Sequence, residues 1–297
     1  MAKNPAMNCG ANRLTPSSLW RGCRRMWIQS AFLLLWLDPL GLRLHNMCGP
    51  VFHCYACPLA TFACPIGVLA SFTALHIFPF IAVGLLVLAA AVFGSLICGW
   101  ACPFGFLQDL LGKIPTPKFD LPKWTGHLRY AVLIGAVFLV PYFFGKDHPL
   151  FVCRFCPAGG LEAAVPSMTS QALAGQQIVW PNALKVTILV LFLIAVLFSR
   201  RPWCRILCPL GAIFSLFNRV SVFFLRLNPD KCTHCERCHK LCQLGIEPEK
   251  SPNDLRCVRC LECTRCGPGA LTLGSIFETS HSTNDMADHR SNCTGGY

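Results

Sequence analysis

Residues 77–105 read IFPFIAVGLLVLAAAVFGSLICGWACPFG, a long apolar run that ends in two cysteines, a proline and a glycine. A helix needs about 17–25 mostly apolar residues to cross the hydrocarbon core of a bilayer, and residues 77–97 supply that length. The whole chain agrees with this stretch, because 54% of its 297 residues are apolar and only 13% are charged. Such a composition excludes an ordinary soluble enzyme. The stretch therefore predicts a membrane helix with a cysteine motif at its end.

Three further apolar stretches resemble the first one. They cover residues 26–42, 128–144 and 183–198. We therefore expect a mainly α fold, a polytopic membrane protein with about four transmembrane helices. The stretch at 26–42 is the weakest candidate, because its uninterrupted part ends at Asp38 and Pro39. It fits either a short span, accommodated by thinning of the bilayer, or a helix that lies in the interface.

Basic residues are distributed unequally between the two sides of the predicted spans. Twelve flank the ends on one side: Lys3, Arg13, Arg21, Arg24, Arg25, Lys113, Lys118, Lys123, Arg129, Arg200, Arg201 and Arg205. Only Arg43, Lys146, Arg154 and Lys185 flank the other side. Because cytoplasmic loops retain positive charge, this predicts a multi-pass protein of the cytoplasmic (inner) membrane with both termini in the cytoplasm. The net charge of +12 follows these flanks, so it indicates membrane lipid as a partner and not nucleic acid.

A Cys-Pro motif, followed by glycine two residues after the proline, occurs four times in the membrane part. The four cysteines are Cys64, Cys102, Cys156 and Cys208, and each has at least one further cysteine shortly before it. Proline fixes the backbone and starts or ends a helix, while glycine permits close approach of another chain segment. Each motif is thus expected to present a thiol at a helix end, and the chain resembles a duplicated two-helix unit.

The predicted topology divides these cysteines into two groups. Cys98, Cys102, Cys204 and Cys208 are expected at the cytoplasmic face, and Cys54, Cys57, Cys64, Cys153 and Cys156 at the outer face. We expect each group to form one composite site for a metal or a further cluster, because ligating groups at membrane boundaries are usually functional. Two alternatives remain open: cysteines that are simply buried as small apolar residues, and disulfides on the outer face.

The C-terminal part contains two groups of closely spaced cysteines. One has the spacing Cys232-x2-Cys235-x2-Cys238-x3-Cys242, and the other consists of Cys257, Cys260, Cys263 and Cys266. In two-cluster ferredoxins three cysteines at steps of three bind one cluster, and the fourth binds the other. On that logic Cys232, Cys235, Cys238 and Cys266 hold one 4Fe-4S cluster, and Cys257, Cys260, Cys263 and Cys242 hold the second. A pair of zinc sites is the alternative, although zinc gains nothing from a third cysteine at the same step.

These patterns divide the chain into four parts. We expect a basic cytoplasmic N-terminus at 1–25, a membrane domain with the four spans and the Cys-Pro motifs at 26–227, a small α+β ferredoxin domain at 228–275, and a disordered tail at 276–297.

The motifs also resemble a known family. The segments CGWACPFGFLQDLL at 98–111 and CRILCPLG at 204–211, followed by a two-cluster ferredoxin, are similar to the membrane-bound polyferredoxins of the NapH type, whose relatives include the membrane part of NosR, MauN and CcoG. The resemblance implies a component like a quinol dehydrogenase, with quinone as substrate and a redox protein as partner.

Two functions follow from the cysteine pattern. The first is electron transfer between the quinone pool, two 4Fe-4S clusters and a redox partner protein. The alternative is a copper or iron reductase, or an assembly factor for a metalloenzyme, in which the membrane thiols bind a soft ion such as Cu(I).

Overall fold

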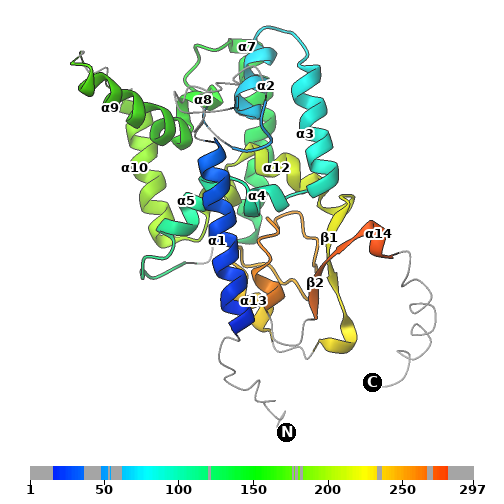
Figure 1. The fold of residues 1–297 in the computed structure, drawn as a ribbon. Coiled ribbons are helices and arrows are strands. Elements are labelled where there is room, and N and C mark those ends of the chain that lie inside the picture. The colour runs from blue at the N-terminus through cyan, green and yellow to red at the C-terminus, as the bar shows by residue number, and fades with distance from the viewer. Residues whose placement is uncertain are drawn as a thin grey trace.

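The computed structural model describes residues 16–36, 48–52, 54, 62–119, 122–175, 177, 180, 183–232, 236–265 and 270–279. These residues are mostly helical, so the mainly α fold is confirmed. Figure 1 shows α2, α7 and α8 at one end of the molecule, a small sheet with α13 at the other end, and α4 and α5 between them.

The elements follow one another in chain order. The first part contains α1 (Pro16–Trp36), α2 (Pro65–Ala74), α3 (Phe80–Phe93), α4 (Leu96–Trp100), α5 (Pro103–Leu111), η1 (Lys123–His127), α6 (Leu128–Val132), η2 (Leu133–Leu139) and α7 (Val140–Phe144). The middle part contains α8 (Val152–Phe155), η3 (Gly159–Ala164), α9 (Val165–Leu173), α10 (Ala183–Phe198), α11 (Pro202–Ile206), α12 (Pro209–Leu216) and η4 (Phe217–Arg219). The last part contains β1 (Phe223–Leu227), η5 (Pro229–Lys231), α13 (Arg237–Leu241), η6 (Glu262–Arg265), β2 (Leu271–Ser275) and α14 (Ile276–Thr279).

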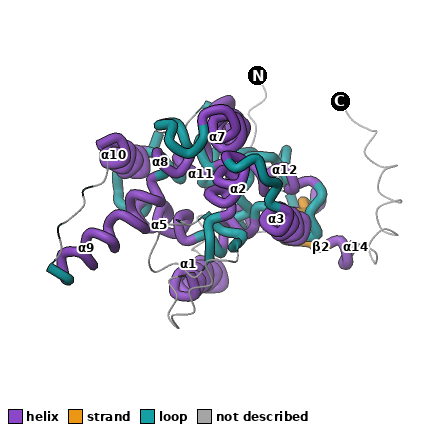
Figure 2. The backbone as a smooth tube through the Cα atoms, turned by 90° about the horizontal axis from the view of Figure 1, so that it is seen from above, coloured by secondary structure: helices purple, strands orange, loops and turns teal. Residues whose placement is uncertain are grey.

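Helices occur at all four predicted spans, but with different lengths. Figures 1 and 2 show α1, α3, α7 and α10 running roughly parallel to one another. Among the described residues, the helix over Trp124–Phe144 is the one that is both long and apolar enough to cross a membrane. Helix α1 begins before the predicted stretch at 26–42, and residues 37–47 lie outside the described part of the chain.

The helix at the predicted span 77–97 is shorter than the apolar stretch itself, because α3 covers Phe80–Phe93 only. Helix α3 has 14 residues, which is about 21 Å at 1.5 Å per residue and less than the hydrocarbon core requires. It ends before Gly94, whose φ of +55° is incompatible with a continued helix. Glycine is required at this position because an added Cβ would lie 2.7 Å from Nη1 of Arg259. Helix α10 has 16 residues and is likewise short.

The predicted duplication is visible in the order of the elements. Helices α3, α4 and α5 form a unit of a long apolar helix, a five-residue helix and a helix that begins with proline, and α10, α11 and α12 repeat the same order. The first cysteine of each pair lies in the five-residue helix, and the second directly precedes the proline. Each proline suits the first helical position, where its missing N–H costs no hydrogen bond.

The C-terminal part contains a two-stranded antiparallel sheet, in which Phe223 lies opposite Ser275 and Leu227 opposite Leu271. Strand β1 therefore begins five residues before the boundary at 228 that we expect from the cysteine pattern, because its partner strand follows the cysteines. Leu244, Ile246 and Val258 join the same buried apolar core as the helical body. The C-terminal part is thus packed against the helical body.

Candidate iron–sulfur sites

The Cys-Pro motifs place their thiols at helix N-termini, as the sequence predicts. Cys64, Cys102 and Cys208 are the residues that directly precede α2, α5 and α12, each with proline in the first helical turn. The backbone N–H of Gly211 donates a hydrogen bond to Sγ of Cys208 at 3.4 Å. The N-terminus of a helix carries partial positive charge, so this position favours the thiolate form that binds metals.

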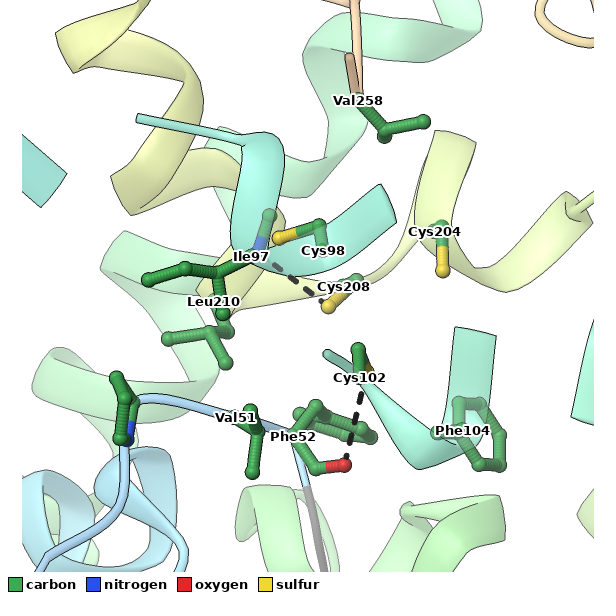
Figure 3. Close-up of a pocket in the computed structure, with 12 residues that line it drawn as sticks. Val51, Phe52, Ile97, Cys98, Cys102, Phe104, Cys204, Cys208, Leu210 and Val258 are labelled. Carbon is green, nitrogen blue, oxygen red and sulfur yellow. Dashed lines mark hydrogen bonds between the residues drawn. The ribbon is translucent and has the colours of Figure 1, made fainter. Parts of the chain in front are cut away.

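The two C-x3-C pairs converge on one small cavity, which we call the inner cysteine site. Cys98 and Cys102 come from the first repeat, Cys204 and Cys208 from the second, and all four are buried. Figure 3 shows the four sulfur atoms between Val258 on one side and Phe52 on the other. In the described residues, no three ligand-type side chains meet closely enough to share one metal ion. A cubane cluster needs its four thiolates further apart, because each binds a different iron.

A second cavity collects the cysteines of the predicted second cluster, and we call it the ferredoxin cysteine site. Cys242, Cys257, Cys260 and Cys263 line it together with apolar side chains such as Leu244. Burial, and after it the neighbouring Cys260, raises the pKa of the Cys257 thiol to about 12. Such thiols carry their protons at neutral pH until a metal replaces them.

The other predicted cluster is only partly within the described residues. Cys235 and Cys266 lie outside them. Cys232 is half-buried, whereas Cys238 is buried and its thiol donates a hydrogen bond to a carboxylate oxygen of Glu249 at 3.0 Å. The assignment of these four residues to one cluster remains a prediction.

The inner and ferredoxin cysteine sites are direct neighbours. Val258 lines both cavities. The loop that carries it is held by Ser95, whose Oγ donates to the carbonyl oxygen of Cys257 at 2.7 Å, and by Asn218, whose Nδ2 donates to the same oxygen at 2.8 Å. Only the backbone of Gly99 permits this approach, since an added Cβ would lie 2.6 Å from the carbonyl oxygen of Val258.

We predict that Gly99→Ala separates the two sites. The new methyl group must push the 257–259 backbone away, and such overpacking typically lowers the free energy of unfolding by about 1–3 kcal/mol. Gly84→Ala in α3 is the matched control, because nothing lies within 4 Å of its added Cβ. Thermal unfolding of both variants in detergent checks the difference. Equal midpoints for Gly99→Ala and Gly84→Ala would contradict the close contact.

Buried arginines surround the two sites, and the sequence pattern did not indicate them as site residues. Arg25, Arg129, Arg201 and Arg259 are at most 5% exposed. Arg25 and Arg201 share the carboxylate of Asp109, and Arg25 also reaches Glu262 at 3.2 Å. Arg129 and Arg259 instead donate to carbonyl, hydroxyl and amide oxygens, without an ion pair to a described carboxylate. Positive charge therefore exceeds negative charge around the thiols.

Asp109 and Gln108 hold this arrangement from α5. Burial raises the pKa of the Asp109 carboxyl, but the guanidinium groups of Arg201 and Arg25 outweigh burial and lower its pKa below the ordinary value. Asp109 is thus ionised at neutral pH. The Nε2 of Gln108 donates a hydrogen bond to Sγ of Cys204 at 3.2 Å, and its Oε1 is buried without a partner. Gln108 and Asp109 follow Cys102 closely in sequence, on the helix that begins at the Cys-Pro motif.

A third group of cysteines gathers near α2 and α8, and we call it the outer cysteine site. Cys156 lies near Cys54, Cys64 and Cys153, and Cys48 lies near Cys64. The Gly159 Cβ position is 3.5 Å from both Cys54 Sγ and Lys185 Nζ. Cys57, also predicted here, lies outside the described residues.

The inner and outer cysteine sites are connected through one short segment. The Cys102 thiol donates to the carbonyl oxygen of Phe52 at 3.8 Å, and Phe52 is two residues from Cys54 (Figure 3). The Phe52 ring packs edge-on against Phe104, with ring centroids 5.5 Å apart. The three sites therefore follow one another from the outer site through the inner site to the ferredoxin site.

A family model described as a 4Fe-4S binding domain matches this chain twice, at residues 75–122 and 182–228. These matches cover the two repeats, with Cys98 and Cys102 in one and Cys204 and Cys208 in the other. The description of this domain thus applies to the segments that form the inner cysteine site.

Three relatives illustrate the similarity of the chain to known proteins. An uncharacterized protein of Methanocaldococcus jannaschii is 28% identical over 65% of this chain and 77% of its own length. The regulatory protein NosR of Stutzerimonas stutzeri is 30% identical over 56% of this chain, which corresponds to 22% of NosR. The ferredoxin-type protein NapH of Escherichia coli is 25% identical over 62% of each chain. No solved structure matches the chain.

The resemblance that the motifs indicate is confirmed. The chain is a relative of the ferredoxin-type proteins NapH and MauN and of NosR.

Proposed function

We propose that this chain is a membrane-bound iron–sulfur protein that transfers electrons between the quinol pool and a redox partner protein. The observation that carries the proposal is the contact between the inner and ferredoxin cysteine sites, which share Val258 as a common wall. Two sets of four thiols, buried in the inner site and buried or half-buried in the ferredoxin site, suit consecutive steps of electron transfer when one residue separates them. The names of NapH as a ferredoxin-type protein and of the matched domain as 4Fe-4S binding support the same chemistry.

The residues of the two sites fit 4Fe-4S clusters better than single metal ions. Sulfur is the donor at all four positions of each site, and iron–sulfur clusters are held by cysteine thiolates. A cluster with four thiolates is an anion, and the buried arginines around the sites supply cations without enough carboxylates to neutralise them. We therefore assign a 4Fe-4S cluster to Cys98, Cys102, Cys204 and Cys208, in addition to the two clusters predicted for the C-terminal cysteines.

The protein residues supply binding, exclusion of water and spacing. Bound clusters accept and donate single electrons. Val51, Phe52, Phe104, Leu210 and Val258 make the inner cavity largely apolar, which keeps water away from the thiolates. The outer cysteine site, reached through Phe52, divides the path across the membrane into shorter steps. At the membrane end of this path, quinol is the proposed electron donor or quinone the proposed electron acceptor.

We infer that the ferredoxin cysteine site faces the cytoplasm. The unequal distribution of basic residues supports this orientation. Four of the twelve are buried and therefore contact the protein interior and not the membrane surface: Arg25, Arg129, Arg201 and Arg205. The eight remaining basic residues on that side still outnumber the four on the other.

This orientation gives a testable prediction. Reporter fusions after Phe144 and after Arg226 are expected to report opposite compartments, with the second in the cytoplasm. A fusion after Lys113 serves as the control and should agree with the fusion after Arg226. The same compartment for Phe144 and Arg226 would contradict the four-span topology.

A redox titration with metal analysis tests the proposed function against its alternative. Iron–sulfur signals that respond to quinol in anaerobically purified protein support electron transfer. Stoichiometric copper bound to the membrane cysteines, without such signals, would instead support a metal reductase or an assembly factor.

A further inference from the structure

Arg201 lies close to cysteines of both the inner and the ferredoxin cysteine sites. It immediately precedes α11, which carries Cys204, and its side chain is almost completely buried. Its guanidinium is close enough to both Cys204 and Cys260 to interact electrostatically with each thiol. Nη1 donates to the carbonyl oxygen of Cys98 at 3.5 Å, which places the guanidinium against the inner site. Ion pairs through Asp109 and Arg25 link it to Glu262, the residue before Cys263 of the ferredoxin site.

The backbone of Arg201 adopts an unfavourable conformation that the surrounding structure maintains. Its φ and ψ are 50° and 52°, in the left-handed region that a residue with a Cβ adopts only at a cost in free energy. Asp109 holds the side chain in return, accepting from Nε of Arg201 at 2.6 Å and also from Nη2. Asp109 is held from the other side by Arg25 at 2.5 Å. The guanidinium is therefore fixed in place.

Charge explains why a fixed cation is useful at this point. An oxidised 4Fe-4S cluster with four thiolate ligands has a net charge of about −2, and one more electron makes it more negative. Two such clusters on either side of Val258 repel one another, and the low dielectric of the interior strengthens the repulsion. A cation between them stabilises the reduced form of both.

We propose that the charge of Arg201 raises the reduction potentials of the inner and ferredoxin centres together. This inference rests on the proposed function, because it requires clusters at both sites. Asp109 has the opposite effect, since its carboxylate partly neutralises Arg201 and Arg25. Gln108 is expected to act on the inner centre alone, because Cys204 is the one described cysteine to which its Nε2 donates.

The test is an anaerobic redox titration of the full chain in detergent, followed by EPR. Arg201→Gln is expected to lower the equilibrium constant for reduction of both centres by about tenfold, which corresponds to about 59 mV for a one-electron couple. Arg201→Lys keeps the charge and should restore most of the shift. Gln108→Leu should lower the potential of the inner centre and leave the ferredoxin centre unchanged.

Controls separate this effect from general damage. Arg219→Gln removes an exposed arginine charge from the neighbouring η4 and should shift neither centre. Asp109→Asn is expected to raise the reduction potentials of both centres, because it removes the carboxylate that partly neutralises Arg201. This variant tests the proposal even if Arg201→Gln does not assemble its clusters. The inference is overturned if the natural protein shows both centres and Asp109→Asn moves neither potential, or if Arg201→Gln assembles and leaves both unchanged. Absence of iron–sulfur signals from the natural protein would overturn the proposed function itself.

Discussion

The double variant Cys102→Ala/Cys208→Ala is expected to lose about four iron atoms per chain and to stop quinol-linked electron transfer. The two residues come from different repeats and line the same cavity, so the variant leaves the inner site with Cys98 and Cys204 alone. Two thiolates cannot hold a cubane that requires four. Because each substitution removes one buried sulfur, the loss of packing is only about 1 kcal/mol each, and the protein should still insert and fold.

Iron analysis and quinol oxidation measured on the same preparation check this result. Cys293→Ala is the control, because Cys293 belongs to none of the predicted sites, and it should keep all iron and activity. Full iron content and full activity in the double variant would show that Cys102 and Cys208 are structural.

The double variant Cys257→Ala/Cys260→Ala is expected to lose a different set of about four iron atoms. These cysteines line the ferredoxin cavity, whereas the inner cavity keeps all four of its thiols. Quinol should therefore still reduce the inner centre, but electrons should not pass on to the partner side. If quinol reduces the inner centre but electrons do not reach the partner protein, the two sites have separate functions.

Rapid-freeze EPR after mixing with quinol measures this separation. Cys293→Ala serves again as the control, because Cys293 belongs to none of the predicted sites and its loss should leave both centres and the transfer between them unchanged. If Cys257→Ala/Cys260→Ala loses the signals of both centres at once, the two sites are not independent.

The helical repeats and their cysteine pairs could be predicted because their signals are local. Proline directly after Cys102 and Cys208 favours the start of a helix independently of tertiary contacts. The thiols therefore lie at helix ends in both copies. Steps of three residues between Cys257, Cys260 and Cys263 likewise bring the thiols toward one cavity. The pairing of Cys242 with this group follows from the same ferredoxin spacing, and the two lie at one cavity in the structure.

Contacts between distant segments could not be predicted from the sequence. Nothing near Gly99 shows that Val258 approaches its backbone, because the two residues are far apart in the chain and the contact depends on how the C-terminal part docks. The end of α3 at Gly94 has the same origin, since Arg259 occupies the space next to it. Local apolar composition predicted a longer helix there.

The role of the arginines was missed for an electrostatic reason. Arg201 and Arg25 stand next to apolar runs, where basic residues usually mark the cytoplasmic surface. A sequence does not show whether such a side chain turns toward water or toward the interior. Their burial beside Asp109 becomes visible only when three segments far apart in sequence meet.

The central claim is tested most directly by metal analysis of the protein purified without oxygen. The analysis measures iron, acid-labile sulfide, zinc and copper per chain. Two clusters in the C-terminal part and one in the inner cysteine site predict about twelve iron and about twelve sulfide per chain, with neither zinc nor copper in stoichiometric amount. Zinc or copper at the cysteines with little iron and no sulfide would contradict the account.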